Sequence, residues 1–322
     1  MRYMESKKKK SFFKLLMKNI FLTILVLVPL LSYLGTTLLI EANSPMEKDP
    51  YVHWSGLDPH REVFISWETS DSMDSVVEYG TTSDFGNSTS NPIKVQMHHV
   101  TLSGLRPDTK YYYRASDSTG KYVSPVQSFW TAPLYKSTNP APFNVTFISD
   151  TQQLFGTGHW NTISKSISEF EDSDFLAIAG DVGQEEEDQD TWNFFWKHAH
   201  ETNRNLPLIT VPGNHDDPDN NKSLYFKYFG NTTNQMDCFY AFNWSNAQFV
   251  MMEIANSGDR NPNESEDNYR AYQWLNNTLE AGLGMQYRIL VFHRQIFSSI
   301  ANDDTLMQYM IPIIEKYNVS LC

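Results

Sequence analysis

Residues 207–216 read PLITVPGNHD, an apolar and β-branched run that ends in the polar group Gly213, Asn214, His215 and Asp216. A short apolar run bounded by proline and glycine predicts a buried strand. Polar side chains directly after such a strand lie where open α/β sheets place their ligands. This stretch therefore predicts a strand of an α/β domain with a candidate site at its carboxyl end.

Three further apolar runs also end on a residue type that binds metals. They are Asn144–Ser149 before Asp150, Phe175–Ala179 before Gly180-Asp181, and Arg288–Phe292 before His293. Strand-like runs that alternate with helix-like ones predict an α/β domain over residues 141–322. One Gly-Asp pair or one histidine after a strand carries little information, but the ordered series of four strand ends indicates a metal site.

The segment 51–133 has the pattern of an all-β domain, because short β-branched and aromatic runs alternate with turn residues. The predicted strands include Val63–Trp67, Ser75–Gly80, His99–Leu102 and Lys110–Ala115. Strands at this spacing predict a sandwich. Tyr111 follows a turn and is placed for a tyrosine corner, in which its hydroxyl bonds to upstream backbone.

The order Asp, Gly-Asp, Gly-Asn-His-Asp, His resembles the calcineurin-like metallophosphoesterase family. Upstream, the chain resembles the fibronectin-III-like N-terminal domain of purple acid phosphatases at Trp67, Tyr79-Gly80, Tyr111–Tyr113 and Phe129–Pro133. The resemblance covers residue 51 to the end. It implies an α/β metallophosphoesterase sandwich, with β-sheets flanked by helices, behind an all-β fibronectin-III-like sandwich.

The resemblance also implies a chemistry, the hydrolysis of small-molecule phosphate esters by a hydroxide held between two metal ions, Fe, Zn or Mn. Asp181 would bridge the ions, Asp150 would complete one, and Asn214 and His293 the other. His215 would contact the phosphoryl oxygens or protonate the leaving group. Three neighbours are candidates for supporting these ligands: Gln152, Gln184 and Arg294.

Three departures from the family pattern bear on these expectations. Gln184 stands where the purple branch has the tyrosine that colours Fe(III), which argues against a tyrosinate–ferric centre. Gln152 stands where the family has glycine or histidine, and could bond phosphate or fill space. The family's Gly-His-x-His motif would follow a strand that Tyr317–Cys322 resembles. The printed sequence ends on that strand, so we expect the motif to be missing from it.

Without that motif each metal would lack one ligand, and we expect the 322-residue chain to be a poor phosphatase. The alternative is a catalytically dead or truncated family member that acts as a cell-surface binding module. The codons after Cys322 would discriminate between an incomplete record and a genuine stop.

The N-terminal segment predicts a membrane anchor. Residues 20–40 are uncharged, and as a helix their 21 residues would measure about 31 Å, the thickness of a bilayer core. The basic segment 1–19 would lie in the cytoplasm, 41–50 would form a linker, and the body would lie outside the membrane. The alternative is a cleaved signal peptide and a secreted body. Eight Asn-x-Ser/Thr triplets after residue 41 are candidate N-glycan sites.

Charge excludes one class of partner. The formal net charge is −13, and the first 40 residues contribute +6, so the remainder carries −19. An acidic body repels nucleic-acid backbones, which argues against nucleic-acid binding by a basic surface. Bound cations would have to supply the attraction for a phosphate ester.

Overall fold

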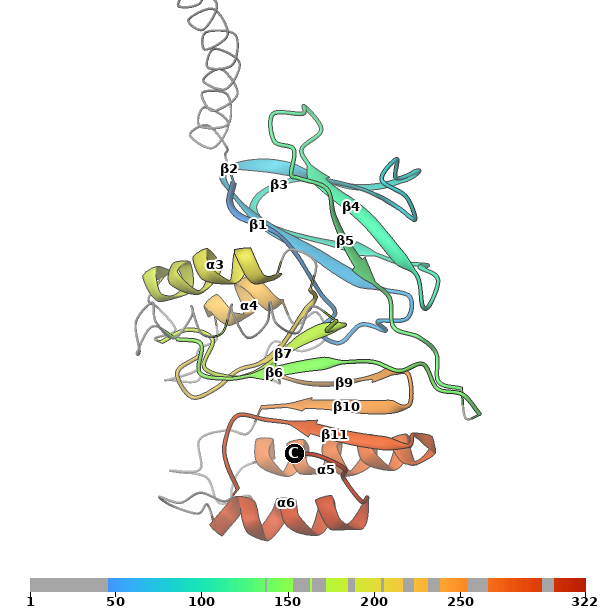
Figure 1. The fold of residues 1–322 in the computed structure, drawn as a ribbon. Helices are drawn as coiled ribbons and strands as arrows, with labels where there is room; N and C mark the ends of the chain where they lie inside the picture. Colours follow the sequence, from blue (N-terminus) through green and yellow to red (C-terminus); the bar gives the residue numbers. More distant parts are fainter. Residues whose placement is uncertain are drawn as a thin grey trace, which may run out of the picture. The chain divides into compact units, whose positions relative to one another are not determined.

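A computed structural model describes residues 46–136, 138–152, 163, 172–184, 189–203, 206–216, 223–230, 238–253, 266–296 and 304–322 (Figure 1). The predicted membrane anchor at 20–40 and its basic flank lie outside these residues. Among the helices described, none has the length and apolar character to cross a bilayer. The first described strand begins at Met46, inside the segment expected to be a linker.

The N-terminal body is one five-stranded antiparallel sheet that folds over on itself. Its strands are β1 (Met46–His53), β2 (Val63–Gly80), β3 (Asn87–Leu102), β4 (Lys110–Ser116) and β5 (Gln127–Trp130). The two strands expected between residues 63 and 80 are a single strand, β2. Its first half pairs with β1 and its second half with β4. The register against β3 shifts between Glu68 and Ser75, and such irregularities let one strand serve two layers.

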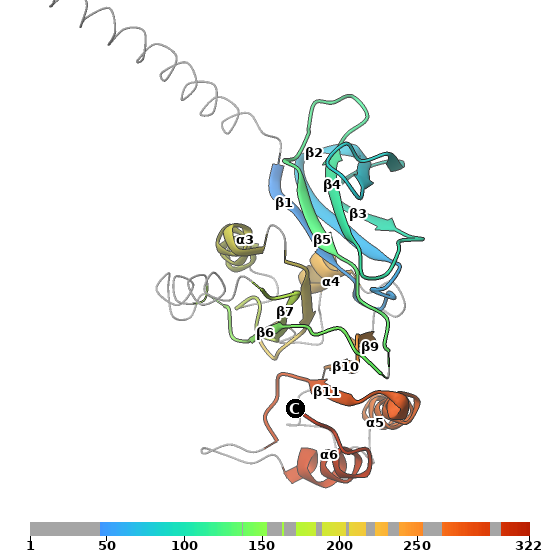
Figure 2. The ribbon, with the colours of Figure 1, turned by 45° about the vertical axis from the view of Figure 1, so that its right-hand side comes forward.

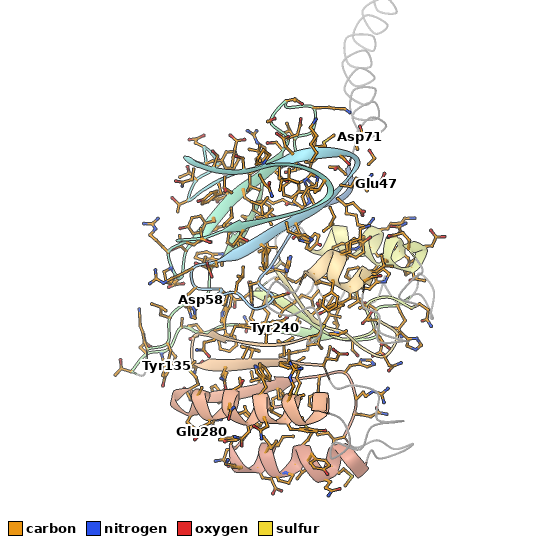
Figure 3. The ribbon with its side chains drawn as sticks, turned by 180° about the vertical axis from the view of Figure 1, so that it is seen from behind. Glu47, Asp58, Asp71, Tyr135, Tyr240 and Glu280 are labelled. Carbon is orange, nitrogen blue, oxygen red and sulfur yellow. The ribbon has the colours of Figure 1, made fainter. Side chains whose placement is uncertain are left out.

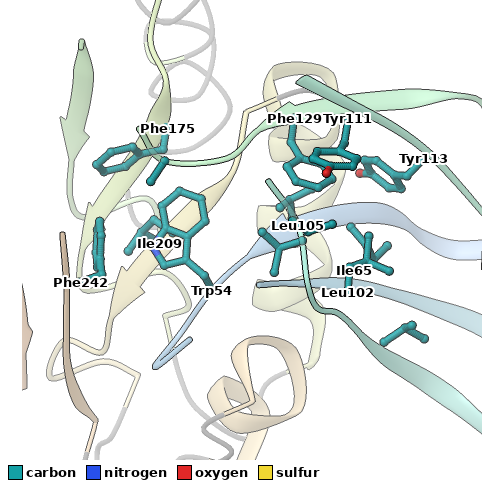
Figure 4. Close-up of a cluster of buried hydrophobic side chains, with 14 of the residues drawn as sticks. Trp54, Ile65, Leu102, Leu105, Tyr111, Tyr113, Phe129, Phe175, Ile209 and Phe242 are labelled. Carbon is teal, nitrogen blue, oxygen red and sulfur yellow. The ribbon is translucent and has the colours of Figure 1, made fainter. Parts of the chain in front are cut away.

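The core between the two layers is aromatic on one side and aliphatic on the other. Figure 4 shows Tyr111, Tyr113 and Phe129 of β4 and β5 facing Ile65 and Leu102 of β2 and β3. The Tyr111 hydroxyl accepts a hydrogen bond from the Arg106 backbone N–H at 3.0 Å. The predicted tyrosine corner is therefore present.

The second part of the chain contains two three-stranded sheets. The first is parallel and consists of β6 (Val145–Ile148), β7 (Phe175–Ala179) and β8 (Leu208–Val211). The second consists of β9 (Phe239–Trp244), β10 (Ala247–Met252) and β11 (Tyr287–Val291), with β10 in the centre. Tyr240 of β9, labelled in Figure 3, lies between the two sheets. Its hydroxyl donates a hydrogen bond to the Thr210 carbonyl of β8 at 2.8 Å, which ties one sheet to the other.

Side chains alternate between the two faces of each sheet, so successive residues of a strand pack against different neighbours. Phe175 of β7 packs with Phe249 of β10 in the core between the sheets, whereas Leu176 and Val250 point to the outer faces. Helices α3 (Gln189–Asn203) and α4 (Ser223–Phe229) cover the outer face of the first sheet. Helices α5 (Glu266–Ala281) and α6 (Asp304–Lys316) cover that of the second, with the short 3₁₀ helix η2 (Gly282–Gly284) after α5 (Figures 1 and 2). The expected sandwich of sheets flanked by helices is thus found.

An aromatic joint connects the β-sandwich to the two-sheet part. Trp54, which follows β1, is fully buried and stacks on Trp244 of β9 with ring centroids 5.4 Å apart. Its ring also makes T-shaped pairs with Phe175 and Phe242, with ring centroids 5.5 Å apart in each pair (Figure 4). Buried aromatic clusters of this kind carry much of the packing energy of a core, so the two parts share one hydrophobic core.

A buried hydrogen-bond chain makes a second connection. His99 Nε2–H donates to the Lys227 carbonyl of α4 at 2.9 Å, so its Nδ1 accepts from the Ser66 hydroxyl at 2.8 Å. The Ser66 oxygen in turn accepts from His53 Nε2–H at 2.9 Å. Burial lowers the pKa of both histidines. Both rings are therefore neutral, and each nitrogen has one defined role.

The tyrosine corner allows a direct test of the sandwich. Tyr111→Phe removes the hydroxyl that accepts the Arg106 N–H, and the loss of one such hydrogen bond costs about 1 kcal/mol. We expect denaturant unfolding to show that loss. Tyr112→Phe is the matched control, because that half-buried ring lies over Lys110 and should change the unfolding free energy by less than about 0.5 kcal/mol. Equal losses in both variants would contradict the assignment.

Candidate metal centre

Three strands from two sheets deliver the central side chains. Asp150 follows β6, Asp181 follows β7, and His293 follows β11. The parallel register sets Ile148 of β6 beside Ile178 of β7, and the pairing continues past the strand ends. There Asp150 N–H donates to the Gly180 carbonyl at 3.1 Å. The loops after β6 and β7 therefore run side by side, and this brings the two carboxylates together.

Asp150, Asp181 and His293 form the group best suited to hold a cation among the residues that the structure describes. One ligand atom from each lies within 4.8 Å of the others. His293 Nε2 lies 3.3 Å from Asp181 Oδ2, and His293 Nδ1–H donates to the Ala179 carbonyl at 2.8 Å. That second bond fixes the ring so that Nε2 faces the carboxylate.

Asp181 is the most heavily engaged of the three. It is 3% exposed. Its Oδ2 contacts His293 and also accepts from Gln152 Nε2–H at 3.1 Å, while its Oδ1 accepts the His215 backbone N–H at 3.0 Å. Burial by itself would raise the pKa of Asp181, but the bonds from His293 and His215 outweigh it and lower the pKa. Burial would likewise lower the pKa of His293, and the Asp181 carboxylate raises it instead. Each partner therefore favours the charged form of the other, the carboxylate of Asp181 and the protonated ring of His293.

Backbone conformation aims both carboxylates. Asp150 has φ of 57° and Asp181 has φ of 54°, in the left-handed region that costs most residues about 1–2 kcal/mol. Aspartate is among the few side chains that tolerate this region. Strain of this kind gathers at functional sites, and here it turns both side chains away from the strand direction.

Two glycines allow the loops to approach closely. A Cβ on Gly180, whose φ is 83°, would lie 2.6 Å from the Cβ of His293. A Cβ on Gly213 would lie 2.2 Å from Asp181 Oδ1. Any larger residue at either position would push a candidate ligand out of place, so both glycines are required for the geometry of the site.

Asp216 binds the backbone of the same loops, and the sequence alone did not assign it this role. It is completely buried, and it accepts three backbone N–H bonds, from Val182 at 3.1 Å, Gly183 at 2.8 Å and Gly213 at 2.9 Å. Burial raises its pKa to about 6 despite these bonds. The only signal in the sequence was its place at the end of Gly-Asn-His-Asp.

His215 is held by Gln184 and by Asp181. Its Nδ1–H donates to the Gln184 backbone carbonyl at 3.0 Å, and the Gln184 amide nitrogen lies 3.3 Å from the same Nδ1. Its own backbone N–H donates to Asp181. In the neutral ring Nε2 then carries no proton and can accept one. Once protonated, Nε2–H can donate to a phosphoryl oxygen.

The remaining predicted residues are placed but their roles stay predictions. Asn214 lies between Gly213 and His215, which both contact Asp181. Arg294 follows His293 and is partly exposed. The structure therefore brings together Asp150, Asp181 and His293 and places Asn214 beside them.

Comparisons with known proteins show which families this chain is similar to. The family model "Calcineurin-like phosphoesterase" matches residues 143–322, and "Purple acid Phosphatase, N-terminal domain" matches residues 49–131. Among curated relatives, purple acid phosphatase 15 of Arabidopsis thaliana is 23% identical over 214 residues, which are 57% of this chain and 38% of that protein. Probable purple acid phosphatase 20 of the same plant is 24% identical over 259 residues, 73% of this chain and 56% of that protein.

Solved structures show a similar fold. A purple acid phosphatase, PPD1, from yellow lupin (Lupinus luteus) seeds matches with a TM-score of 0.64 and 16% identity, over 86% of this chain and 57% of that one. A structure of PhoD matches with the same TM-score and identity, over 86% of this chain and 70% of that one. The alignments span about 40% of the length of the first curated relatives.

Gly213→Ala tests the close approach of the loops. The new methyl group would overlap Asp181, and overpacking of a rigid site costs about 1–3 kcal/mol. We expect a lower midpoint in denaturant unfolding. Gly284→Ala is the control, because a Cβ there meets nothing within 4 Å and should leave stability unchanged or slightly higher. A Gly213→Ala midpoint equal to that of wild type would show that the loops are farther apart than described.

Proposed function

This chain belongs to the calcineurin-like phosphoesterase family, and we propose that it hydrolyses small-molecule phosphate esters at a centre of two metal ions. The observation that carries the proposal is the surroundings of Asp181 Oδ2. This one oxygen has His293 Nε2 at 3.3 Å and the Gln152 amide at 3.1 Å, with Asp150 in the same group. A carboxylate that bridges two metal ions must lie among the ligands of both, and Asp181 lies among the candidate ligands here.

The residues present fit a two-metal centre by their chemistry. Carboxylate, amide and imidazole ligands suit Mn, Zn and Fe. Asp150 and Asp181 would hold one ion, while Asp181, Asn214 and His293 would hold the other. Gly180 and Gly213 have no side chain, so the loops that carry the ligands can approach each other closely. Bound ions of this kind polarise a phosphoryl oxygen and lower the pKa of water.

The protein groups around the centre would orient the ester. His215 is fixed by Gln184 and by Asp181, so its ring can contact a phosphoryl oxygen or give a proton to the leaving group. The acidic body repels a phosphate, so the cations would supply most of the attraction that decides where the ester binds.

The proposal is tested by assaying the full chain with p-nitrophenyl phosphate in Mn²⁺, Zn²⁺ or Fe²⁺. In keeping with the ligands expected to be missing, we expect weak turnover that EDTA removes and that Asp181→Asn lowers further, toward the scale of about a hundredfold for losing one electrostatic group of an active site. Asp172→Asn is the control, because that carboxylate is exposed at the opposite end of β7. Binding of metal and phosphate without turnover would favour the binding module instead, and binding of neither would rule out both.

A second measurement tests the bridging role. Asp181→Asn should lower the content of both metal ions, because its carboxylate would neutralise both cations, whereas Asp150→Asn should lower the content of one. Asparagine tolerates the left-handed backbone at both positions, so the comparison isolates charge. Elemental analysis after dialysis gives the metal content. Equal loss in the two variants would argue against a bridge at Asp181.

A further inference from the structure

The face of the β-sandwich that packs on α4 carries two histidines joined by a serine. His53 of β1 is completely buried, and its ring lies against Phe229 of α4 with ring centroids 6.2 Å apart. His99 of β3 is partly buried and donates to the Lys227 carbonyl of α4. Ser66 of β2 lies between the two rings and hydrogen-bonds both. Each of the three strands thus places one member of this chain at the joint with α4.

The hydrogens of the chain have defined places. The Lys227 carbonyl can only accept, so His99 carries its hydrogen on Nε2 and leaves Nδ1 for the Ser66 hydroxyl. Ser66 donates its one hydrogen there, and its oxygen accepts from His53 Nε2–H. His53 Nδ1 is then unprotonated and lies 3.3 Å from the Ser55 hydroxyl. A proton added to His99 Nδ1 would face the Ser66 hydrogen, so the chain as found requires that ring to be neutral.

The groups around the two rings do not compensate a positive charge. The polar contacts of His53 and His99 are with hydroxyls and a backbone carbonyl. Glu68, a carboxylate on the same face of β2 as Ser66, is held instead by Lys48 at 2.8 Å and by Lys227 at 2.5 Å. Three tyrosines also lie around the chain, and burial raises the pKa of each, so that all stay neutral: Tyr51, Tyr228 and Tyr240. A proton taken up by His53 would therefore be a buried charge without a counter-ion, which is costly.

We propose that the His53–Ser66–His99 chain is an acid-sensitive switch, which holds the β-sandwich on α4 while both rings are neutral and releases α4 when they take up protons. The inference does not depend on the proposed function. It assigns the joint a role beyond packing, because the same contacts that close it exclude a proton.

The direction of the pH dependence follows from the two states of the joint. In the open joint both rings reach water, where a histidine takes up a proton near pH 6.5. In the closed joint burial lowers the pKa of His53 and of His99, and His99 lowers the pKa of His53 further. Opening therefore takes up protons and becomes more favourable as the pH falls below about 6.5. The effect levels off only below the lowered pKa values of the closed joint.

Other contacts allow the joint to open while the fold persists. Trp54 stacks on Trp244, an apolar contact without a titratable group. Tyr225, in the first half of α4, bonds to the Thr210 hydroxyl of β8 at 2.7 Å, and burial raises its pKa, so this bond also survives in acid. Acid should therefore loosen α4 at its carboxyl end, where Lys227 meets His99.

Hydrogen–deuterium exchange of the full chain between about pH 7.5 and pH 5, corrected for the intrinsic exchange rate at each pH, tests the switch. We expect the opening equilibrium of α4 to rise by up to about tenfold per pH unit for each histidine that stays neutral in the closed joint. The protection of the central strand β10 should stay constant. Glu68 keeps its charge in this range, because the bonds from Lys227 and Lys48 outweigh its burial and lower its pKa.

Glutamine variants separate the titration from the packing. The terminal amide of glutamine has a donor and an acceptor but does not titrate. His53→Gln should remove the larger part of the pH dependence, since His53 is completely buried, and the double variant with His99→Gln should remove all of it. His98→Gln is the matched control. Burial lowers the pKa of His98 to about 4, but this ring stacks on Trp67 inside the sandwich, so the slope for α4 should not change.

The slope with pH is the readout, so a variant that is less stable at every pH still gives an answer. A slope for α4 that survives in the double variant would overturn the proposal, as would wild-type protection of α4 that stays constant down to about pH 5. Equal losses in α4 and β10 would indicate global unfolding and would overturn it too.

A measurement on wild type decides the matter if the double variant does not fold. NMR of the full chain with ¹³C-labelled histidine follows the protonation of each ring. We expect the rings of His53 and His99 to stay neutral until α4 loses protection. A His53 ring that takes up a proton near pH 6.5 while α4 remains protected would overturn the proposal.

Discussion

The burial of the Asp181 carboxylate is the constraint on which the candidate site depends. A carboxylate at 3% exposure is costly unless its oxygens are satisfied. Here Oδ1 takes a backbone N–H from the loop after β8, and Oδ2 faces His293 from the loop after β11. Three loops from two sheets therefore meet on one side chain. Moving the loop after β8 or the loop after β11 would remove one of the partners that satisfy this buried charge.

The rest of the fold makes that meeting possible. The two sheets face each other through Phe175 and Phe249, whose rings lie 5.2 Å apart, so the ends of β7 and β11 are held at a set separation. Trp54 extends this core into the β-sandwich through Trp244. Close packing of large rings leaves little room for relative movement. A site assembled from both sheets thus relies on a core that lies well outside the site.

Asp216 and Gly213 show how a short motif serves several purposes. In Gly-Asn-His-Asp, Gly213 allows the approach to Asp181, the backbone of His215 binds it, and Asp216 fastens the loops after β7 and β8. Because Asp216 takes three backbone donors, it performs inside the protein what water would do at the surface. The neighbouring His215 ring is held for chemistry by the same loop.

Sequence by itself determined the strand ends and the order of the candidate ligands, because short continuous apolar runs form buried strands and the polar groups after them lie at the carboxyl ends of those strands. It placed β7 with its observed bounds and β8 and β11 to within one residue, and it identified the tyrosine corner at Tyr111. Only the tertiary structure decided that residues 63–80 form one bent strand, since the bend depends on pairing with β1 and β4 from distant parts of the chain. The tertiary structure also decided that β6 is a partly exposed edge strand. It decided as well that Gln152 donates to Asp181 and that Asp216 binds the loop backbone next to Asp181. Such roles follow from contacts between loops, and a glutamine or aspartate carries no local signal of which distant atom its side chain will meet.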